Sequence, residues 1–292
     1  MPLHSAPASF NTRGTLLIFW DYDTQWGADR SRSAGGIKNW GRLDFENTEE
    51  LLDIHARFEI PACFAAVGAA ALAGDRPYHD PAQLRRVHAA GHEIGSHAFR
   101  HEWIPGLPHR ALMDILRRSK NALEQCLSDH VLTFVPPYNQ PFDYAARFSF
   151  SLSERREAGK HRTDLPGLCR SLREAGFGFC RVAYRSLLLR AFERLVRRRL
   201  DRPCRLHSIE GVACARINTP CGFDPTSQAV LKKCSERGGL VVAYGHPHSL
   251  HSGNSQDARH LIAFLAAAAS LRRAGRLRIC RPKDIIDEAH AG

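Results

Sequence analysis

The chain has 292 residues, of which 43% are apolar and 24% are charged. These proportions are typical of a folded protein with a sizeable core and exclude a disordered chain. No stretch reaches the roughly 18 to 20 apolar residues that a membrane-spanning helix needs. Residues 1–14 lack the apolar segment of a secretion signal, so we expect a protein that stays in the cytoplasm.

The net charge and the cysteine content indicate the kind of partner and the cellular compartment. The formal net charge of +11 favours anionic partners without identifying them. Nine arginines fall within residues 181–205, and this basic block fits either a solvated helix face or a site for an anion or an anionic membrane surface. The nine cysteines are odd in number and include no Cys-x-x-Cys pair, which favours reduced thiols in a cytoplasmic protein.

Short apolar runs alternate with amphipathic segments along the chain. After a loose tail, the predicted strands are 15–20, 61–67, 93–96, 130–135, 178–182, 205–217, 239–244 and 277–280. The predicted helices are 46–58, 81–90, 110–127, 165–175, a basic helix before residue 205, 225–237, 257–274 and the C-terminal end. A loop is expected from Asp23 to Gly41, and residues 143–160 are too polar to assign. This alternation predicts βαβ units, and seven or eight repeats favour one closed or partly open barrel of parallel strands over two domains.

The most informative stretch is 91–101, which reads GHEIGSHAFRH. If a helical turn begins near His97, the imidazoles of His97 and His101 lie on one face and can bind one metal ion. His92, beside them, is interpreted as a structural residue. A zinc site of this kind needs a third protein ligand and an open position for water, so a carboxylate is expected from another strand end.

Parallel barrels place their chemistry at the C-terminal ends of the strands. The residues that follow predicted strands are Asp21, Asp23, His97, His101, Pro136, Pro137, Tyr138, Asn139, His246 and His248. Asp23 and the two histidines of the motif form a two-nitrogen, one-oxygen set, for which zinc is the first choice. Asp21 lies on the same side of an extended chain as Asp23 and can act as the general base. His246 can protonate a leaving amine, and the backbone N–H of Tyr138 can stabilise an oxyanion.

These residues resemble the motifs of NodB-type polysaccharide deacetylases of carbohydrate esterase family 4. The matching segments are Asp21-Tyr22-Asp23, residues 91–101, Val135-Pro136-Pro137-Tyr138 and Tyr244-Gly245-His246, and the resemblance covers roughly residues 15–250. It implies a distorted (β/α) barrel, with one catalytic domain over residues 15–292 behind a tail at 1–14. It also implies metal-dependent removal of an acetyl group from an amino sugar. The implied base is Asp21, the implied acid is His246, and the implied ligands are Asp23, His97 and His101, with cobalt, nickel, iron or manganese as alternatives to zinc.

The sequence departs from the family pattern at several positions. Tyr22 separates the two acids, and Val135 stands where the family has an arginine that pairs with the base. Arg181 is counted among the predicted substrate-binding residues. It is also the candidate to take the place of the arginine that is missing at Val135. Asn139 and Gln140 follow Tyr138 in place of a glycine and suit sugar hydroxyls. No segment matches the family's fourth motif, so the residue that orients His246 is not predicted.

The remaining candidates concern the substrate. Trp26 and Trp103 lie close in sequence to the ligands and are predicted to stack on a sugar, while His248 is predicted to line the pocket. Together these residues predict a cytoplasmic deacetylase of surface-polysaccharide biosynthesis, such as that of O-antigen, or of glycoconjugates. Its amino sugar is expected on a nucleotide or lipid diphosphate, with residues 181–205 facing the diphosphate or the inner face of the membrane.

Two other functions fit the same residues. The first is a non-catalytic module that binds anionic polymers through the basic block of residues 181–205. The second is a deformylase or another amidase, because the site recognises an amide carbonyl and not its acyl group. No nucleic-acid motif accompanies the charge, so no specific nucleic acid is expected as a partner. The sequence does not indicate an oligomeric state.

Overall fold

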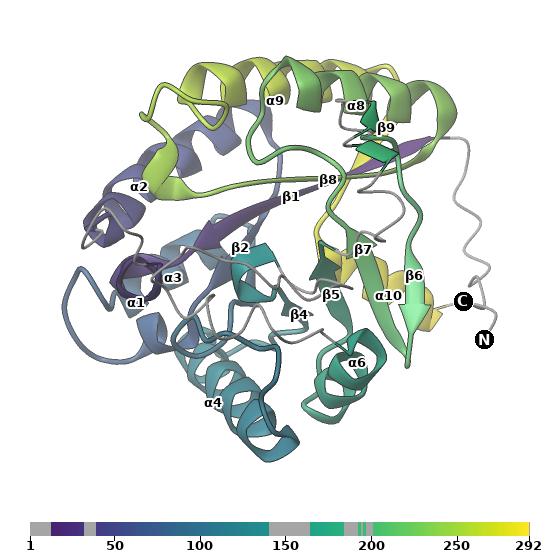
Figure 1. Ribbon diagram of the computed structural model, residues 1–292. Coiled ribbons are helices and arrows are strands. Elements are labelled where there is room, and N and C mark those ends of the chain that lie inside the picture. The colour runs from purple at the N-terminus through teal and green to yellow at the C-terminus, as the bar shows by residue number, and fades with distance from the viewer. Residues whose placement is uncertain are drawn as a thin grey trace.

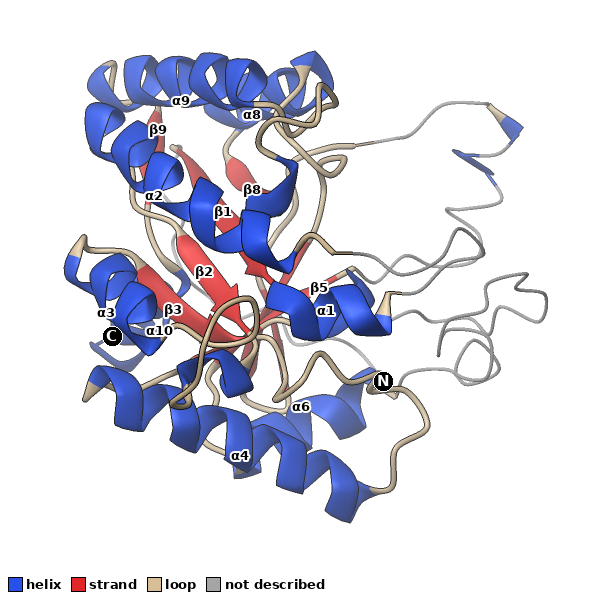
Figure 2. Ribbon diagram, turned by 90° about the vertical axis from the view of Figure 1, so that its left-hand side faces the viewer, coloured by secondary structure: helices blue, strands red, loops and turns tan. Residues whose placement is uncertain are grey.

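The structure is a computed structural model and describes residues 13–31, 39–139, 164–183, 192–193, 195–196 and 201–291. Its strands are β1 (Gly14–Tyr22), β2 (Cys63–Ala66), β3 (Glu93–Ser96), β4 (Thr133–Phe134), β5 (Phe179–Val182), β6 (His207–Ile209), β7 (Val212–Arg216), β8 (Gly239–Gly245) and β9 (Leu277–Ile279). Its helices are α1 (Thr24–Arg30), α2 (Gly41–Phe58), α3 (Pro81–Ala89), α4 (His109–Leu127), α6 (Leu165–Glu174), α8 (Pro225–Arg237), α9 (Ala258–Arg273) and α10 (Pro282–Ala291). Three short 3₁₀ helices are η1 (Gly68–Ala71), η2 (Pro137–Asn139) and η3 (Pro247–Ser249). Figures 1 and 2 show the strands at the centre, with α2, α8 and α9 on one side and α4 and α6 on the other.

The strands form one sheet in the order β6-β7-β5-β4-β3-β2-β1-β8, and β9 pairs with β1. The β6–β7 pair is antiparallel and every other pair is parallel, so all strands except β6 run in one direction. Along β1, residues 14–16 pair with β9 and residues 19–22 pair with β2. The predicted distorted (β/α) barrel is confirmed.

Side chains take the place of a partner strand along the outer edge of β8. Asn218 donates from Nδ2 to the carbonyl of Leu240 at 2.8 Å and accepts from the amide of Val242 at 2.9 Å. The backbone of Cys204 exchanges two further hydrogen bonds with Leu240, at 2.9 and 2.8 Å. The amide side chain therefore satisfies backbone groups that an open sheet edge leaves unpaired, and it links β7 to β8 across the seam of the barrel.

Two apolar cores lie on the two faces of the sheet. Residues 16, 18, 20 and 22 of β1 pack outward against the helices, and residues 17 and 19 pack inside the barrel. Because strand side chains alternate, Asp21 continues the inward set at the C-terminal end of β1. Ile286 of α10 joins the inner core and lies against Gly178, just before β5, so α10 closes the opposite end of the barrel. The site is thereby confined to the C-terminal ends of the strands.

Most predicted elements are present, with ends shifted by a few residues. The predicted loop after Asp23 is wrong, because it contains α1. Gly27 belongs to this helix, and a Cβ atom on it would lie 2.5 Å from the Asp23 Cβ, so close packing requires the glycine there. The predicted strand 205–217 is also wrong. It is the hairpin β6–β7, which turns at Glu210 and Gly211, with φ of 52° and 82°.

Several predictions fall on residues outside the described ranges. They concern residues 1–12 of the tail, Gln140, the whole polar segment 143–160 and most of the basic helix before residue 205. None of the nine cysteines forms a disulfide. Within the described part of the chain, no helix combines the length and apolar character needed to cross a bilayer.

Candidate active site

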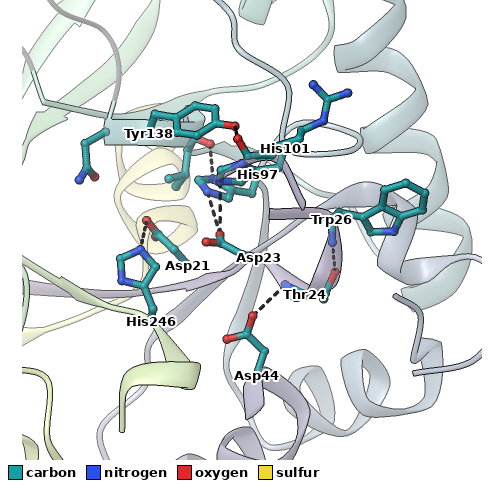
Figure 3. Close-up of polar contacts among 12 residues, drawn as sticks. Asp21, Asp23, Thr24, Trp26, Asp44, His97, His101, Tyr138 and His246 are labelled. Carbon is teal, nitrogen blue, oxygen red and sulfur yellow. Dashed lines mark hydrogen bonds and ion pairs between the residues drawn. The ribbon is translucent and has the colours of Figure 1, made fainter. Parts of the chain in front are cut away.

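Three buried side chains converge at the ends of β1 and β3 (Figure 3). The Asp23 Oδ1 atom lies 3.3 Å from Nε2 of His97 and 3.6 Å from Nε2 of His101. Donors that each lie about 2 Å from one tetrahedral zinc ion are roughly 3.3 Å apart, so this spacing suits a single ion. The three side chains are the ones predicted to hold a metal, and the structure brings all of them together.

The two histidines reach this point from a turn, so the predicted helical turn is wrong. Ala98 and His101 have left-handed backbones, with φ of 63° and 58°. The amides of Phe99 and Arg100 donate to the Glu102 carboxylate at 3.0 and 2.7 Å. Because the left-handed residue directly after His97 diverts the chain and a local carboxylate takes the free amides, no helix starts here.

Hydrogen bonds and burial prepare this set for a cation. His97 donates from Nδ1 to the carbonyl of Val135 at 2.7 Å, which leaves Nε2 as the ligand atom facing Asp23. Burial lowers the pKa of His101 to about 3, so its ring is neutral. The Oδ1 atom of Asp23 is buried and has no hydrogen-bond partner among the described residues. A buried carboxylate oxygen without a donor is costly, and a divalent cation bound by Asp23 and the two imidazoles removes that cost.

Asp21 is held by a buried arginine. The two oxygens of Asp21 accept from Nη1 and Nη2 of Arg181 of β5, each at 2.6 Å. The guanidinium lies over the rings of Phe19 and Tyr244. Burial raises the pKa of Asp21, but the charge of Arg181 outweighs it, so the net pKa is lowered and the carboxylate is ionised. Arg181 therefore pairs with the proposed base, which is the role of the family's arginine that Val135 replaces in this sequence. Its side chain is buried and does not face solvent.

His246 follows β8 and reaches toward Asp21, with Nε2 3.9 Å from Oδ2 of that carboxylate. Gln256 accepts with Oε1 from both the backbone amide of His246, at 2.7 Å, and its Nδ1, at 2.9 Å. Burial lowers the pKa of His246, but contact with Cys221 and the charges of Asp23 and Asp21 outweigh it and raise the pKa above its usual value. The sequence did not reveal Gln256, because a neutral amide in a loop carries no signal that marks it as a partner of a histidine.

The loop after β4 brings Tyr138 and Asn139 to the site. The Tyr138 ring packs edge-on against His101, at 4.5 Å between centroids, and at a tilt of 48° against Trp103, at 5.1 Å. Asn139 donates from Nδ2 to the hydroxyl of Tyr244 at 2.9 Å. One of the two amides predicted to bind sugar thus has its Nδ2 bound to Tyr244, and Gln140 lies outside the described residues.

The other predicted substrate residues have different surroundings. His248 lies beside His246, at 5.1 Å between ring centroids, and Trp103 reaches the site through Tyr138. Trp26 packs instead on Tyr78, and the guanidinium of Arg100 lies 4.6 Å from the centre of its ring. Because this cation covers one indole face, Trp26 is less suited than Trp103 to stack on a sugar.

Left-handed backbone at residues other than glycine gathers around the site. It occurs in the three turns that carry the candidate residues, at Thr24, Ala98, His101, Tyr138 and Asn139. The remaining described examples are two helix C-caps and one hairpin turn, at Glu59, Ser128 and Glu210. Such conformations cost on the order of 1–3 kcal/mol each and persist where surrounding structure enforces them, which is typical of functional sites.

Comparison with known proteins agrees with this geometry. A family model described as polysaccharide deacetylase matches residues 41–150. This segment is therefore similar to polysaccharide deacetylases. The predicted relationship to NodB-type deacetylases is confirmed, and so is the assignment to the carbohydrate deacetylases among the hydrolases. The matched segment contains His97, His101 and Tyr138, whereas Asp21, Asp23 and His246 lie outside it.

Solved structures share the fold of the chain. A Mycobacterium smegmatis protein named as a polysaccharide deacetylase has a TM-score of 0.68 at 18% identity, over 99% of this chain and 96% of its own. The Puue allantoinase has a TM-score of 0.62 at 15% identity, over 100% and 94%. A Pseudomonas aeruginosa PAO1 protein named as a polysaccharide deacetylase has 0.59 at 14%, over 96% and 92%. No curated protein matches the chain.

Proposed function

We propose that the chain is a metal-dependent N-deacetylase that releases acetate from an N-acetylated amino sugar. The observation that carries this proposal is the buried set of Asp23, His97 and His101 with Asp21 and His246 beside it. Two imidazole nitrogens and one carboxylate oxygen favour zinc, and cobalt, nickel, iron and manganese are the alternatives. This complete set argues against a non-catalytic module, which has no need of a buried carboxylate lacking a hydrogen-bond donor.

Each residue of the site has a separate task in the proposed reaction. The ion, when bound, supplies a Lewis acid for the amide carbonyl and lowers the pKa of a water molecule. Asp21 accepts the proton of the attacking water, and Arg181 keeps its carboxylate ionised and oriented. The backbone N–H of Tyr138 donates to the oxyanion as the carbonyl carbon becomes tetrahedral. His246 gives a proton from Nε2 to the departing amine as the C–N bond breaks, so the products are acetate and the free amino sugar.

The sugar is proposed to lie between the aromatic and imidazole side chains of the rim. His248 and Trp103 are the substrate-binding residues nearest the reacting groups. Asn139 supports this wall through Tyr244. Trp26 is proposed to contact the substrate farther from the reacting groups, and Gln140 remains a predicted substrate contact.

The carrier of the sugar is proposed to be a nucleotide or lipid diphosphate in surface polysaccharide or glycoconjugate biosynthesis. The basic composition of residues 181–205 supports an anionic carrier or contact with the inner face of the membrane. Within this block, Phe192 and Leu195 expose 52% and 80% of their surfaces, as expected of a membrane-contacting segment. Nine cysteines without a disulfide support a reducing, cytoplasmic location.

A second candidate is hydrolysis of another amide, by deformylation or by opening of a cyclic amide. It is favoured by one observation, the likeness in fold to an allantoinase over 94% of that chain. The metal ligands, base and acid act on the carbonyl and the leaving nitrogen, and none of them selects an acyl group. The two candidates are distinguished by the product, which is acetate only in the first.

The test is release of acetate from N-acetylated hexosamines, free and linked to nucleotide or lipid diphosphates. We expect turnover that a chelator abolishes and zinc restores. His97→Ala should reduce turnover by about 100-fold or more, because loss of a ligand exceeds the 10–100-fold effect of residues that support ligands. His251→Ala is the control, since this histidine is 57% exposed and pairs with Glu50. Turnover that persists after both chelation and the His97 change rejects the proposed function.

A further inference from the structure

Asp44, in the first turn of α2, is a fully buried carboxylate that no motif predicted. Its Oδ2 accepts from the backbone amide of Thr24 at 2.8 Å (Figure 3). Its Oδ1 accepts from the backbone amide of His248 at 2.9 Å and from the Nδ1 of the same residue at 3.0 Å. Aspartate is almost never fully buried unless it is paired, so three converging N–H donors indicate a specific task for this residue.

The first contact of Asp44 is with the metal side of the site. Thr24 directly follows the ligand Asp23 and has a φ of 55°, which is a strained conformation for a β-branched residue. The Asp44 carboxylate binds the amide of this strained residue. The position of Asp23 after β1 therefore depends on a side chain from another element.

The second contact is with the acid side. The His248 ring stacks on Trp40, with 4.7 Å between centroids and 24° between planes. With Nδ1 bound to Asp44, Nε2 is the ring nitrogen of His248 left for other contacts, and the ring lies 5.1 Å from that of His246 between centroids. One turn further along α2, Asn47 donates to the carbonyl of Pro247 at 2.8 Å, so the same helix holds this loop twice.

We propose that Asp44 is a positioning residue that joins the two sides of the active site. One carboxylate oxygen orders the Asp23–Thr24 turn for metal binding, and the other presents Nε2 of His248 to a hydroxyl or amide group of the substrate. The role of His248 rests on the proposed function, whereas the effect on the metal ligand does not.

The first test is Asp44→Asn with Glu46→Gln as its matched control. An asparagine can accept on one side only, and its amide group then faces an N–H donor on the other side. We expect a folded protein whose affinity for zinc, measured by calorimetric titration, falls by about 10-fold to 100-fold, which is the usual effect of losing a residue that orients a ligand. Glu46 lies on the same helix but is 47% exposed and pairs only with Arg42 among the described contacts, so its change should leave zinc affinity intact.

The second test is His248→Ala, which removes the imidazole and leaves Asp44 to hold Thr24. We expect an increase of about tenfold in KM for the acetylated sugar with zinc affinity unchanged. Asp44→Asn should show both defects. A general loss of packing would change zinc affinity and KM together in both variants. A change in KM alone in His248→Ala, with a change in both quantities in Asp44→Asn, therefore identifies positioning.

The outcomes are distinct. A folded Asp44→Asn protein with wild-type zinc affinity and wild-type KM overturns the proposal. If that protein does not fold, an unchanged KM in His248→Ala overturns the substrate role, and a raised KM with intact zinc affinity supports it. If the unmodified protein binds zinc but releases no acetate from any sugar, the proposed function fails while the zinc affinity of Asp44→Asn still tests the link to Asp23.

Discussion

The two sides of the active site are built in different ways. On the metal side, the three proposed ligands come from two short segments, two from the turn after β3 and the third directly after β1, and Asp44 of α2 adds one contact beside Asp23. On the acid side, the partners are far apart in sequence. Arg181 holds Asp21 across 160 positions, and Asp44 holds His248 across 204. Local segments thus provide the donors for the cation, while contacts between distant elements set the charge and direction of the proposed base and the direction of His248.

The largest effect is expected on the metal side, from Asp23→Asn. The amide keeps the shape of the side chain but removes the charge that offsets burial of a divalent ion. Zinc affinity should fall by about 100-fold or more and acetate release should reach background, as measured by titration and product assay. Asp53→Asn, an exposed change on α2, is the control. Near-normal zinc binding by Asp23→Asn would remove this residue from the ligand set.

This contrast explains what the sequence could predict. The histidine motif and the two acids at the end of β1 indicate the proposed ligands and base, because they lie at strand ends in a parallel barrel. The turn at Ala98 was mistaken for a helix, since residue spacing does not report a left-handed backbone. Gln256 and Asp44 were missed because their importance comes from which side chains they meet after folding.

On the acid side, Arg181→Met should have the next largest effect. The change leaves Asp21 buried without its cation, which typically costs about 3–5 kcal/mol of unfolding free energy. Turnover should fall by about 100-fold or more, because the base loses its orientation. Unfolding in urea measures the first effect and acetate release the second.

The double variant Asp21→Asn with Arg181→Met separates charge from packing. Removing both charges should recover most of the stability lost in Arg181→Met while leaving turnover at background. If the double variant is no more stable than Arg181→Met, the lost stability comes from the packing of Arg181 on Phe19 and Tyr244 instead of from its pairing with Asp21.

A smaller effect on turnover is expected from Gln256→Ala. Without the Oε1 acceptor, the His246 ring is free to turn, so kcat should fall by about tenfold while zinc affinity stays unchanged. Gln256→Glu keeps an acceptor at this place and should recover most of the loss. Gln228→Ala on α8 is the control. If kcat is the same in Gln256→Ala and the control, His246 is oriented without this amide.

The smallest effect on turnover is expected from Glu93, which lies in the histidine motif but at the opposite end of β3. Its carboxylate accepts from the hydroxyl of Thr133 and from the backbone amide of Lys283 at the start of α10, the latter at 2.9 Å. Burial raises its pKa to about 7. The folded protein therefore resists ionisation of Glu93, and its unfolding free energy should decline as the pH rises from the ordinary value of this group through 7.

Above pH 7 this loss is on the order of 3 kcal/mol. Glu93→Gln removes the ionisation and can keep both contacts, because the Thr133 hydroxyl can accept from the new amide group. Between pH 5 and pH 8, the unfolding free energy measured in urea should thus fall less in Glu93→Gln than in the unmodified protein. The kcat should be unchanged. Identical pH dependence in the two proteins would show that Glu93 does not titrate in this range. A separate result, a lower kcat in Glu93→Gln, would show that the motif residue at the closed end of the barrel influences the metal side after all.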